Sequence, residues 1–354
     1  MSANFTAPYL HALSRTLLEA ADVPRHIAHP VSDVLVGANL VGHDSHGVLR
    51  IPAYLRRLDA GDMIPDAEPE VVHDNGNAVI MDGRSGKGIY TCLKGTEFAI
   101  ERAKDVGMCV VTFKRIHHIG RLGHYVEMAA RAGCVGFVTV GRGATGDGIV
   151  LPYGSKSPTF GTNPIAWGIP TGDDTPFILD YATSVVAEGK LQVARSRSLS
   201  VPEGTIVDKH GTPTTDPLDF YDGGSLLPFS GHKGSAMLML PCLLGSLAGD
   251  GLTYQGMTGG CFVQMIDVER FTDLEAYQRT VRAFLDDVKG TEPADGFDEV
   301  LVPGDFEALN RADRLQTGIE IPQPILDDFD EWGEKLGVDT SSIDVLPEDE
   351  IRYR

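Results

Sequence analysis

Apolar residues spaced three and four positions apart dominate the first sixty residues. Leu10, Leu13 and Leu17 form one such stripe, and similar stripes follow at two further places. This spacing places apolar side chains on one face of a helix. The chain therefore begins with a helical region, with helices predicted over residues 6–20, 31–41 and 51–60.

Between residues 70 and 180 the pattern changes to short apolar runs that are typical of strands. Asn75-Gly76 is a pair that favours two-residue turns and predicts a hairpin between residues 71–72 and 78–81. Further strands are predicted over residues 107–113, 134–140, 165–169 and 177–179, and helices over residues 90–106 and from about 125 to 132.

Residues 198–228 form a long stretch rich in Gly, Pro and Asp, whose length suggests a working or interfacial loop. The remaining predicted elements are helices over 185–195, 235–248, 274–288, 306–315 and 327–336, a strand over 261–266, and a strand and turn over 300–304. Strands and helices alternate without a regular strand-helix-strand rhythm. We therefore expect an α/β fold of mixed α+β type with a mixed sheet, and not a doubly wound parallel sheet.

The balance of charge narrows the possible partners. Asp and Glu number 50 and Lys and Arg 30, so the formal charge is −20. A surface of this kind repels phosphate backbones and anionic membranes, which argues against a nucleic-acid or membrane partner. An anionic substrate would need positive charge concentrated at its binding site.

The five cysteines are scattered and never form a Cys-x-x-Cys pair. They predict buried free thiols in a reducing compartment, and neither a disulfide framework nor a zinc knuckle. The N-terminus lacks the basic and apolar regions of a secretory signal, and the apolar run 236–248 is too short for a membrane span. We expect a cytoplasmic protein.

His46 stands four residues before Arg50 and pairs a proton carrier with a carboxylate-binding group. Histidine exchanges protons near neutral pH, and a guanidinium holds a carboxylate by two parallel hydrogen bonds. Gly42 and Gly47 flank the pair and would let the backbone approach a ligand. The segment predicts chemistry on a small organic acid; the alternatives are a structural histidine and an ion-paired arginine.

His117 and His118 lie between a predicted strand and a predicted helix, where functional loops are common. Adjacent residues at a strand end point opposite ways, so at most one of them is expected to face a site. His124 follows closely, but the three histidines lack the spacing and the nearby carboxylate of a metal site. No metal is therefore expected.

Asp180 precedes a predicted helix, where it would orient a histidine, bind a ribose or cap the helix. Thr183 and Ser184 carry the same ambiguity. Lys233 stands between two glycines at the start of another helix. That position suits a diphosphate held by helix N–H groups and one ammonium, and it equally suits a surface lysine on a turn.

Residues 141–146, Gly-Arg-Gly-Ala-Thr-Gly, match the dinucleotide fingerprint G-x-G-x-x-G behind a predicted strand. That fingerprint must open a helix, yet Gly148, Pro152 and Gly154 follow in quick succession. No acidic residue ends a second strand about 20 residues further on. We expect a mobile glycine-rich loop and no Rossmann site, and the lack of a following Gly-Lys-Ser/Thr argues against a phosphate-binding NTPase.

Taken in order, several stretches resemble the malate/L-lactate dehydrogenase-like family of NAD(P)-dependent oxidoreductases, which is distinct from the Rossmann lactate and malate dehydrogenases. That family includes ureidoglycolate, L-sulfolactate and diketogulonate dehydrogenases or reductases, and cyclic imino acid reductases. The resemblance extends from about residue 10 to residue 340. The matching stretches are Asp44-Ser45-His46-Gly47 with Arg50 and Tyr54, His118-x-Gly120 with Gly123 and Tyr125, Gly161-Thr162-Asn163-Pro164, Asp180-x-Ala182-Thr183-Ser184, Gly231-His232-Lys233-Gly234 and Pro303-Gly304.

The resemblance implies a non-Rossmann cofactor domain, built on a mixed, largely antiparallel sheet flanked by helices. It also implies an interlocked homodimer with the active site near the subunit boundary. We expect an N-terminal helical region of residues 1–70 and a discontinuous substrate and dimerisation domain of residues 71–120 and 290–354. Residues 121–289 would form the NAD(P)-binding domain.

The same resemblance implies roles for single residues. Arg50 would hold the substrate carboxylate, and His46 or His118 would transfer the proton, with Asp180 as a further catalytic residue. Ser45, Tyr54 and His118 would contact the substrate as well. Contacts with NAD or NADP are implied for Asn163, Asp180, Ala182, Thr183, Ser184, His232, Lys233, Pro303 and Gly304. The family usually has Asn where this chain has His117, which bears on the binding of the substrate oxygen.

The sequence thus predicts a malate/lactate-like dehydrogenase that transfers a hydride between nicotinamide and C2 of a small 2-hydroxy or 2-oxo carboxylic acid. One alternative is a cyclic imine-2-carboxylate reductase of the same family. Another is a catalytically silent binding protein, against which the presence of both His46 and His118 argues. The identity of the acid, the choice between NAD and NADP, and the direction in the cell stay open.

Overall fold

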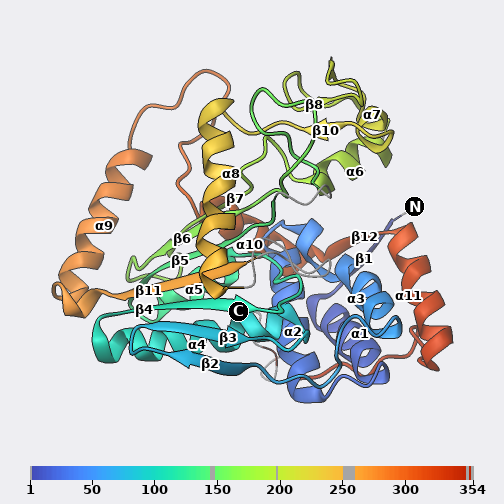
Figure 1. Cartoon of the computed structure of the whole chain (residues 1–354), viewed down its shortest axis with the longest axis horizontal. Helices are drawn as coiled ribbons and strands as arrows, with labels where there is room; N and C mark the ends of the chain where they lie inside the picture. The colour runs from blue at the N-terminus through green and yellow to red at the C-terminus, as the bar shows by residue number, and fades with distance from the viewer. Residues whose placement is uncertain (1, 144–147, 197, 250–259, 348–350, 352–354) are drawn as a thin grey trace.

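The computed structural model describes residues 2–143, 148–196, 198–249, 260–347 and 351. At its centre lies a seven-stranded sheet with the order β2-β3-β4-β11-β5-β6-β7 (Figure 1). Strands β3 and β4 pair in parallel, and the other neighbours in this order pair antiparallel. The predicted mixed, largely antiparallel sheet is confirmed. Its strands are β2 Glu70–Asp74, β3 Ala78–Asp82, β4 Met108–Lys114, β5 Cys134–Val140, β6 Ile165–Ile169, β7 Phe177–Tyr181 and β11 Cys261–Asp267.

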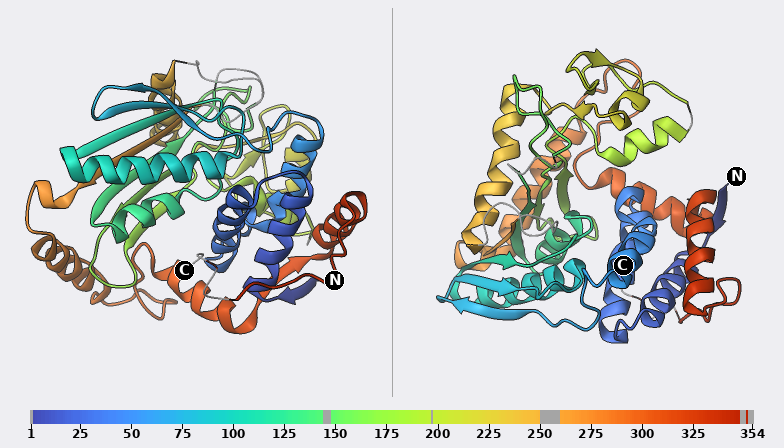
Figure 2. Two further views of the ribbon diagram at one scale, coloured as in Figure 1. Left: turned by 90° about the horizontal axis from the view of Figure 1, so that it is seen from below. Right: turned by 45° about the vertical axis from the view of Figure 1, so that its right-hand side comes forward.

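Helices cover both faces of this sheet (Figure 2). Successive residues of a strand point to opposite faces. Phe137 of β5 therefore packs with Ile165 and Phe262 on the side of helix α8, whereas Val138 joins the larger core beneath α4 and α5. These helices are α4 Gly88–Val106, α5 Gly123–Arg131 and α8 His232–Gly245.

The predicted N-terminal helices are present and pack beside the sheet. Two single turns of 3-10 helix, η1 Asp44–His46 and η2 Val48–Arg50, connect the second helix to the third. Helices from the C-terminal part of the chain complete this region (Figure 2). The helices are α1 Ala7–Ala20, α2 Arg25–Leu40, α3 Ile51–Asp59, α10 Asp305–Thr317 and α11 Gln323–Leu336.

The stretch 198–228, predicted as a long loop, folds with its neighbours into a small unit with its own core. Leu191, Ile206 and Leu226 are fully buried in that core. The unit lies at the upper right of Figure 1. Its elements are α6 Glu188–Ser196, β8 Ile206–Val207, β9 Pro213–Thr214, α7 Pro217–Tyr221 and β10 Ser225–Leu226.

Three details differ from the sequence-based expectation. Of the strand and turn predicted over 300–304, the strand is wrong and the turn is present, with the amide of Asp305 donating to the carbonyl of Val302 at 3.0 Å. The helix expected from residue 185 begins at Glu188. The sequence analysis also missed a two-stranded antiparallel sheet formed by β1 Ser2–Phe5 and β12 Ile319–Pro322.

Strands from both sides of the expected domain boundary at residue 120 share the central sheet, because β11 pairs with β4 and with β5. Where domains begin and end stays a prediction. All five cysteines are buried free thiols, as predicted. In the described part of the chain, no helix is long and apolar enough to span a membrane.

Candidate functional site

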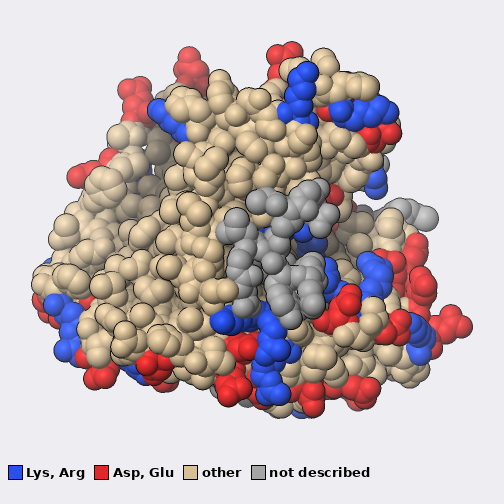
Figure 3. Space-filling model, viewed as in Figure 1, with Lys and Arg blue, Asp and Glu red and all other residues tan. Residues whose placement is uncertain are grey.

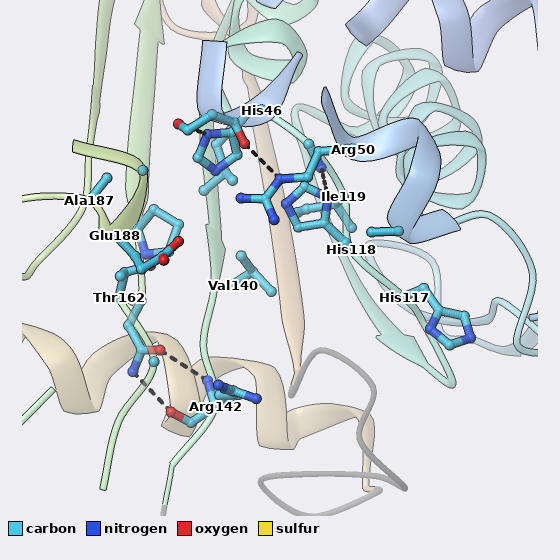
Figure 4. A pocket seen from close by; sticks show the side chains of 18 of the residues that line it. His46, Arg50, His117, His118, Ile119, Val140, Arg142, Thr162, Ala187 and Glu188 are labelled. Carbon is cyan, nitrogen blue, oxygen red and sulfur yellow. Dashed lines mark hydrogen bonds between the residues drawn. The ribbon is translucent and has the colours of Figure 1, made fainter. Parts of the chain in front are cut away.

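A cavity of about 550 Å³ opens at the edge of the central sheet, beside the N-terminal helices (Figure 4). Its wall comes mainly from five short stretches, residues 45–57, 117–122, 140–142, 161–164 and 187–189. They belong to the turn before α3, the loop after β4, the end of β5, the loop before β6 and the start of α6. The fold thus joins segments that are far apart in the sequence.

His46, His118 and Arg50 all line this cavity. The first two are the candidates for proton transfer, and the third is the candidate for binding the substrate carboxylate. The two imidazole rings lie 5.6 Å apart, centroid to centroid, and are stacked with an interplanar angle of 25°. Nε of Arg50 donates to the carbonyl oxygen of Ser45 at 2.6 Å. This bond holds the guanidinium so that its terminal nitrogens extend into the cavity beside both rings (Figure 4).

Two donors converge on Nδ1 of His118. The hydroxyl of Tyr54 lies 2.7 Å from it, and the backbone N–H of Gly120 lies 3.4 Å from it. Because the amide of Gly120 can only donate, Nδ1 accepts, and the neutral ring carries its proton on Nε2. His46 has a different partner, since its Nδ1 lies 2.9 Å from Oγ of Ser45.

Burial favours the neutral form of both rings. It lowers the pKa of His46 to about 3, with further contributions from the positive charges of Arg50, His43 and Arg121. Burial, followed by the charge of Arg50, also lowers the pKa of His118 well below its usual value. Both imidazoles are therefore neutral near pH 7 while the cavity holds no anion.

Asn39 holds the turn that carries His46 and Arg50. Its amide donates to a carboxylate oxygen of Asp44 at 2.7 Å and accepts from the backbone N–H of Val48 at 2.9 Å. Arg314 of α10 grips the same carboxylate through two nitrogens, at 2.6 and 3.0 Å. A Cβ at Gly47 would lie 2.1 Å from the side chain of Asn39. Gly47 thus makes room for Asn39, whereas the sequence had suggested room for a ligand.

Asp180 lies outside the cavity wall. Its buried carboxylate accepts from the backbone N–H of Gly123 at 2.7 Å, at the start of α5, and lies 3.8 Å from Nε of Arg121. Among the residues that the structure describes, these are its recorded partners, and neither is a histidine. The carboxylate caps a helix and pairs with a buried arginine, and Tyr54 occupies the position beside a histidine that was suggested for Asp180.

Asn163 lines the cavity, but its side chain makes hydrogen bonds to backbone groups of the protein. Its oxygen accepts from the backbone N–H of Arg142 at 3.1 Å, and its nitrogen donates to the carbonyl of Leu238 at 2.7 Å. The buried hydroxyl of Thr183 lies 2.8 Å from the carbonyl of Asn163, and that of Ser184 donates to the carbonyl of Val186. These residues shape the backbone behind the cavity, and their predicted contacts with a cofactor stay predictions.

Two of the other predicted cofactor segments lie next to the cavity wall, and the third lies apart from it. Thr183 N donates to the carbonyl of Thr162, and Phe229 N donates to the carbonyl of Thr183, so that residues 182–184 lie beside the start of α8. His232 and Lys233 are exposed there. Pro303 and Gly304 lie at the opposite end of β7, where the carbonyl of Pro303 accepts from the N–H of Ile178.

His117 points away from its neighbour His118, as adjacent residues were expected to do (Figure 4). Its Nε2 lies 3.0 Å from the carbonyl oxygen of Asp62. Of the glycine-rich stretch 141–146, Gly141 and Arg142 line the cavity and no helix opens at residues 141–143. Residues 144–147 lie outside the described part of the chain.

A separate group of potential metal ligands lies between α1 and α2, outside the cavity wall. Nε2 of His11 and Nε2 of His29 lie 3.2 and 3.6 Å from the two carboxylate oxygens of Asp33. Distances of this size are those of imidazoles paired with a carboxylate. The group is therefore not part of the candidate site.

Sequence reasoning missed four residues of the site. Asn39 was detectable as a polar residue within an apolar helix, where a buried amide needs partners. Glu188, Arg57 and Arg142 line the cavity without any local pattern to mark them. Arg57 is one of two consecutive arginines on α3, and only the three-dimensional structure distinguishes it from Arg56.

Comparison with known proteins agrees with this geometry. Residues 5–330 match the family model described as malate/L-lactate dehydrogenase. The L-lactate dehydrogenase of Cupriavidus necator is 35% identical over 317 residues, which cover 86% of this chain and 90% of that protein. The solved structure of sulfolactate dehydrogenase from Methanocaldococcus jannaschii superposes with a TM-score of 0.87 at 32% identity, covering 96% of this chain and 99% of that one. 

A further solved structure, Δ1-piperideine-2-carboxylate reductase from Pseudomonas syringae, superposes with a TM-score of 0.81 at 30% identity. It covers 93% of this chain and 99% of that one. The family match spans most of the described fold and includes the cavity. The chain belongs to the malate/L-lactate dehydrogenase family, and it is therefore an oxidoreductase of the dehydrogenase class.

Proposed function

We propose that the protein is an NAD(P)-dependent dehydrogenase that interconverts a small 2-hydroxy carboxylic acid and its 2-oxo acid. The observation that carries this proposal is the meeting of Arg50 with two stacked neutral imidazoles, His46 and His118, in one cavity. The cavity volume of about 550 Å³ suits a small acid together with the nicotinamide end of a cofactor. The names of the relatives, which include lactate and sulfolactate dehydrogenases, support the same reaction.

Arg50 would bind and orient the substrate. Its Nε is held by the carbonyl of Ser45, so the two terminal nitrogens stay available for the substrate carboxylate in a bidentate arrangement. With the carboxylate fixed, C2 and its oxygen lie near the two imidazoles, and orientation of this kind contributes strongly to catalysis.

The proton would pass through one of the two histidines. In oxidation, His46 or His118 would accept the hydroxyl proton on a ring nitrogen that carries no hydrogen, while the hydride leaves C2 for the nicotinamide and the hydroxyl oxygen becomes the 2-oxo oxygen. In reduction, the same nitrogen returns the proton. Nε2 of His118 already carries a proton in the neutral ring, so in this tautomer it can donate a hydrogen bond to the substrate oxygen but cannot accept the hydroxyl proton, which it could accept only in the other tautomer. The choice between the two residues is left to experiment.

The residues at the start of α8 fit the diphosphate of NAD or NADP. Gly231 precedes the helix without a side-chain cap, so the first N–H groups of α8 are available, and the ammonium of Lys233 is exposed beside them. When bound, the cofactor would supply or accept the hydride at C4 of its nicotinamide. Thr183 connects the two regions, because its N–H donates to Thr162 of the cavity wall and its carbonyl accepts from Phe229 just before the helix, which supports cofactor contacts along that path.

A cyclic imine-2-carboxylate reductase is the second candidate. The similarity to the piperideine-carboxylate reductase structure favours it, and Arg50 would hold the carboxylate of such a substrate in the same way. The two reactions differ in the atom that receives the proton, which is a nitrogen in the imine and an oxygen in the 2-oxo acid.

We also propose that the protein forms a homodimer. Helix α8 exposes Met239, Leu240 and Leu243, and the face around it carries few charged side chains (Figure 3). An apolar area on a chain with a charge of −20 favours contact with another protein surface. The five free thiols support a reducing compartment and hence a cytoplasmic location.

The test is an assay of reduced-nicotinamide oxidation with NADH and, separately, NADPH, against a panel of 2-oxo acids and cyclic imino acids. Turnover of a 2-oxo acid supports the first proposal, and preferential turnover of a cyclic imine supports the second. His46→Gln and His118→Gln should be assayed beside the parent, because the residue that transfers the proton should cost about 100-fold or more in kcat. Absence of both turnover and nicotinamide binding would contradict both proposals.

A further inference from the structure

Arg57 places a second guanidinium on the helix that lines the cavity. Arg50 immediately precedes α3, and Tyr54 and Arg57 follow it at spacings of four and three residues, which places the three side chains on one side of the helix. All three line the cavity. Arg56 is one residue away in sequence, yet it is exposed and does not line the cavity.

The charge of Arg57 acts within the cavity. It contributes to the lowered pKa of both His117 and His118, after the larger effect of burial in each case. Among the described residues, no hydrogen bond or ion pair of its guanidinium is found. A half-buried guanidinium in a cavity wall favours an anion as its partner.

The charges that line the cavity do not cancel. Arg50 and Arg57 both line the cavity, and among the described residues no carboxylate pairs with either guanidinium; the lining also includes the carboxylate of Glu188. Glu188 is held on its own side, where it accepts from Tyr221 at 2.9 Å and from Gln192 at 2.9 Å. A substrate with one carboxylate would therefore leave positive charge unmatched.

We propose that Arg57 binds a second acidic group of the substrate, so that the cavity prefers 2-oxo and 2-hydroxy acids with a carboxylate or sulfonate at the far end. This inference rests on the proposed dehydrogenase function. Arg57 lies seven positions after Arg50, which corresponds to a rise of about 10 Å along a helix axis. Two long side chains that start this far apart can reach both ends of a four-carbon diacid.

The experiment compares a substrate pair that differs in the second acidic group, oxaloacetate and 2-oxobutyrate, in the parent enzyme and in Arg57→Gln. We expect kcat/KM for oxaloacetate to fall by about 10- to 100-fold, the loss typical of one charge-assisted hydrogen-bonded contact, and that for 2-oxobutyrate to change less than about threefold. Arg57→Lys should retain part of the preference for the diacid. Arg56→Gln, which removes the same charge from the exposed face of α3, is the matched control and should leave both values unchanged.

Three results would overturn the inference. Equal losses of kcat/KM for both substrates would mean that Arg57 has a general role. A rise confined to the KM of the cofactor would mean that Arg57 contacts the cofactor. An unchanged ratio of kcat/KM between oxaloacetate and 2-oxobutyrate would mean that Arg57 does not recognise the second acidic group. Dicarboxylate and monocarboxylate binding, measured by thermal shift with malate and 2-hydroxybutyrate, provides a readout that does not need turnover. If no 2-oxo acid is turned over but Arg57→Gln still loses malate binding selectively, the proposed reaction fails and the anion subsite stands.

Discussion

At the scale of single residues, the chemistry of the site depends on which nitrogen of each imidazole is hydrogen-bonded to the protein and which one faces the cavity. The N–H of Gly120 and the hydroxyl of Tyr54 both donate to Nδ1 of His118, so Nε2 is the nitrogen left for a ligand in the cavity. The types of His46, Arg50 and His118 and their order along the chain were enough to predict them as candidates. Tyr54 was expected to contact substrate, but its hydrogen bond to a histidine could not be predicted, because it joins residues 64 positions apart.

Tyr54→Phe removes one of the two donors to Nδ1 of His118 while it keeps the aromatic ring. We expect kcat to fall by about 10-fold or more, because the neutral ring would then also populate the tautomer with its proton on Nδ1. The measurement is kcat against pH in both directions, with the thermal unfolding midpoint as a control for folding. An unchanged pH profile at full activity would show that His118 needs no such partner.

Acid pH should destabilise the folded protein through its buried histidines. The pKa is lowered to about 3 for His46 and to about 4 for His124, and lies well below its usual value for His118. In the unfolded chain these groups titrate near pH 6.5, so below that pH the unfolded state binds protons that the folded state does not. The free energy of unfolding should therefore fall as pH drops from 6.5 to 5, by at most about 1.4 kcal/mol per pH unit for each histidine.

Urea unfolding at several pH values between 5 and 7 measures this dependence. That window lies above the usual titration of carboxylates, so histidines dominate the slope. The double variant His46→Gln/His118→Gln should show a shallower slope than the parent. The same slope in both would contradict the assignment of the effect to these two rings.

At the scale of elements, short-range patterns predicted most helices and the strands of the central sheet, because each has a clear apolar period or turn signal. The failures have specific causes. Strands β1 and β12 are four residues long and pair across more than 300 positions, so neither carries a local signal. The stretch 300–304 begins with three aliphatic residues but contains Pro303, which has no N–H to donate to a sheet.

Gly47→Ala tests how α2 fixes the turn before α3. The new Cβ would overlap Asn39, which would have to give up its bonds to Asp44 and Val48. We expect a loss of about 1–3 kcal/mol in the free energy of unfolding and a larger relative loss of activity, because His46 and Arg50 lie on this turn. Chemical denaturation and kcat/KM measure the two effects.

The double variant Gly47→Ala/Asn39→Ala separates overlap from the glycine itself. Removing the amide relieves the contact, so the double variant should lose less than the sum of the two single variants. Strict additivity would mean that Gly47 matters for another reason, such as its own backbone conformation.

At the scale of the whole molecule, the central sheet brings together the distant parts of the chain that line the cavity. The outer surface of the molecule determines how copies of the chain associate. The fold class followed from the irregular alternation of strands and helices. The positions of Arg57, Arg142 and Glu188 in one wall did not, since they depend on how α3, β5 and α6 are placed around the sheet edge.

Leu243→Glu tests the proposed dimer. The leucine is 61% exposed on α8, and a charge in the centre of an apolar contact should raise the dimer dissociation constant by about 10-fold or more. Light scattering after size-exclusion chromatography measures the change. Leu218→Glu, at a similarly exposed position on α7, is the control and should leave the oligomeric state unchanged.

If the Leu243→Glu variant has the same dimer dissociation constant as the parent, the dimer contact lies on another surface. A parent protein that is monomeric at all concentrations would contradict the homodimer itself.

The position of β11 also has a consequence for the order in which the protein can form during synthesis. β11 lies between β4 and β5, although it follows both of them by more than 100 residues. A ribosome that has released residues 1–240 exposes two half-sheets, β2-β3-β4 and β5-β6-β7, each with one unpaired edge where β11 will insert. Unpaired edges invite pairing with other chains, and late long-range pairing slows folding. The nascent chain therefore passes through a period in which it depends on chaperones or on low concentration, and this period ends when β11 closes the sheet.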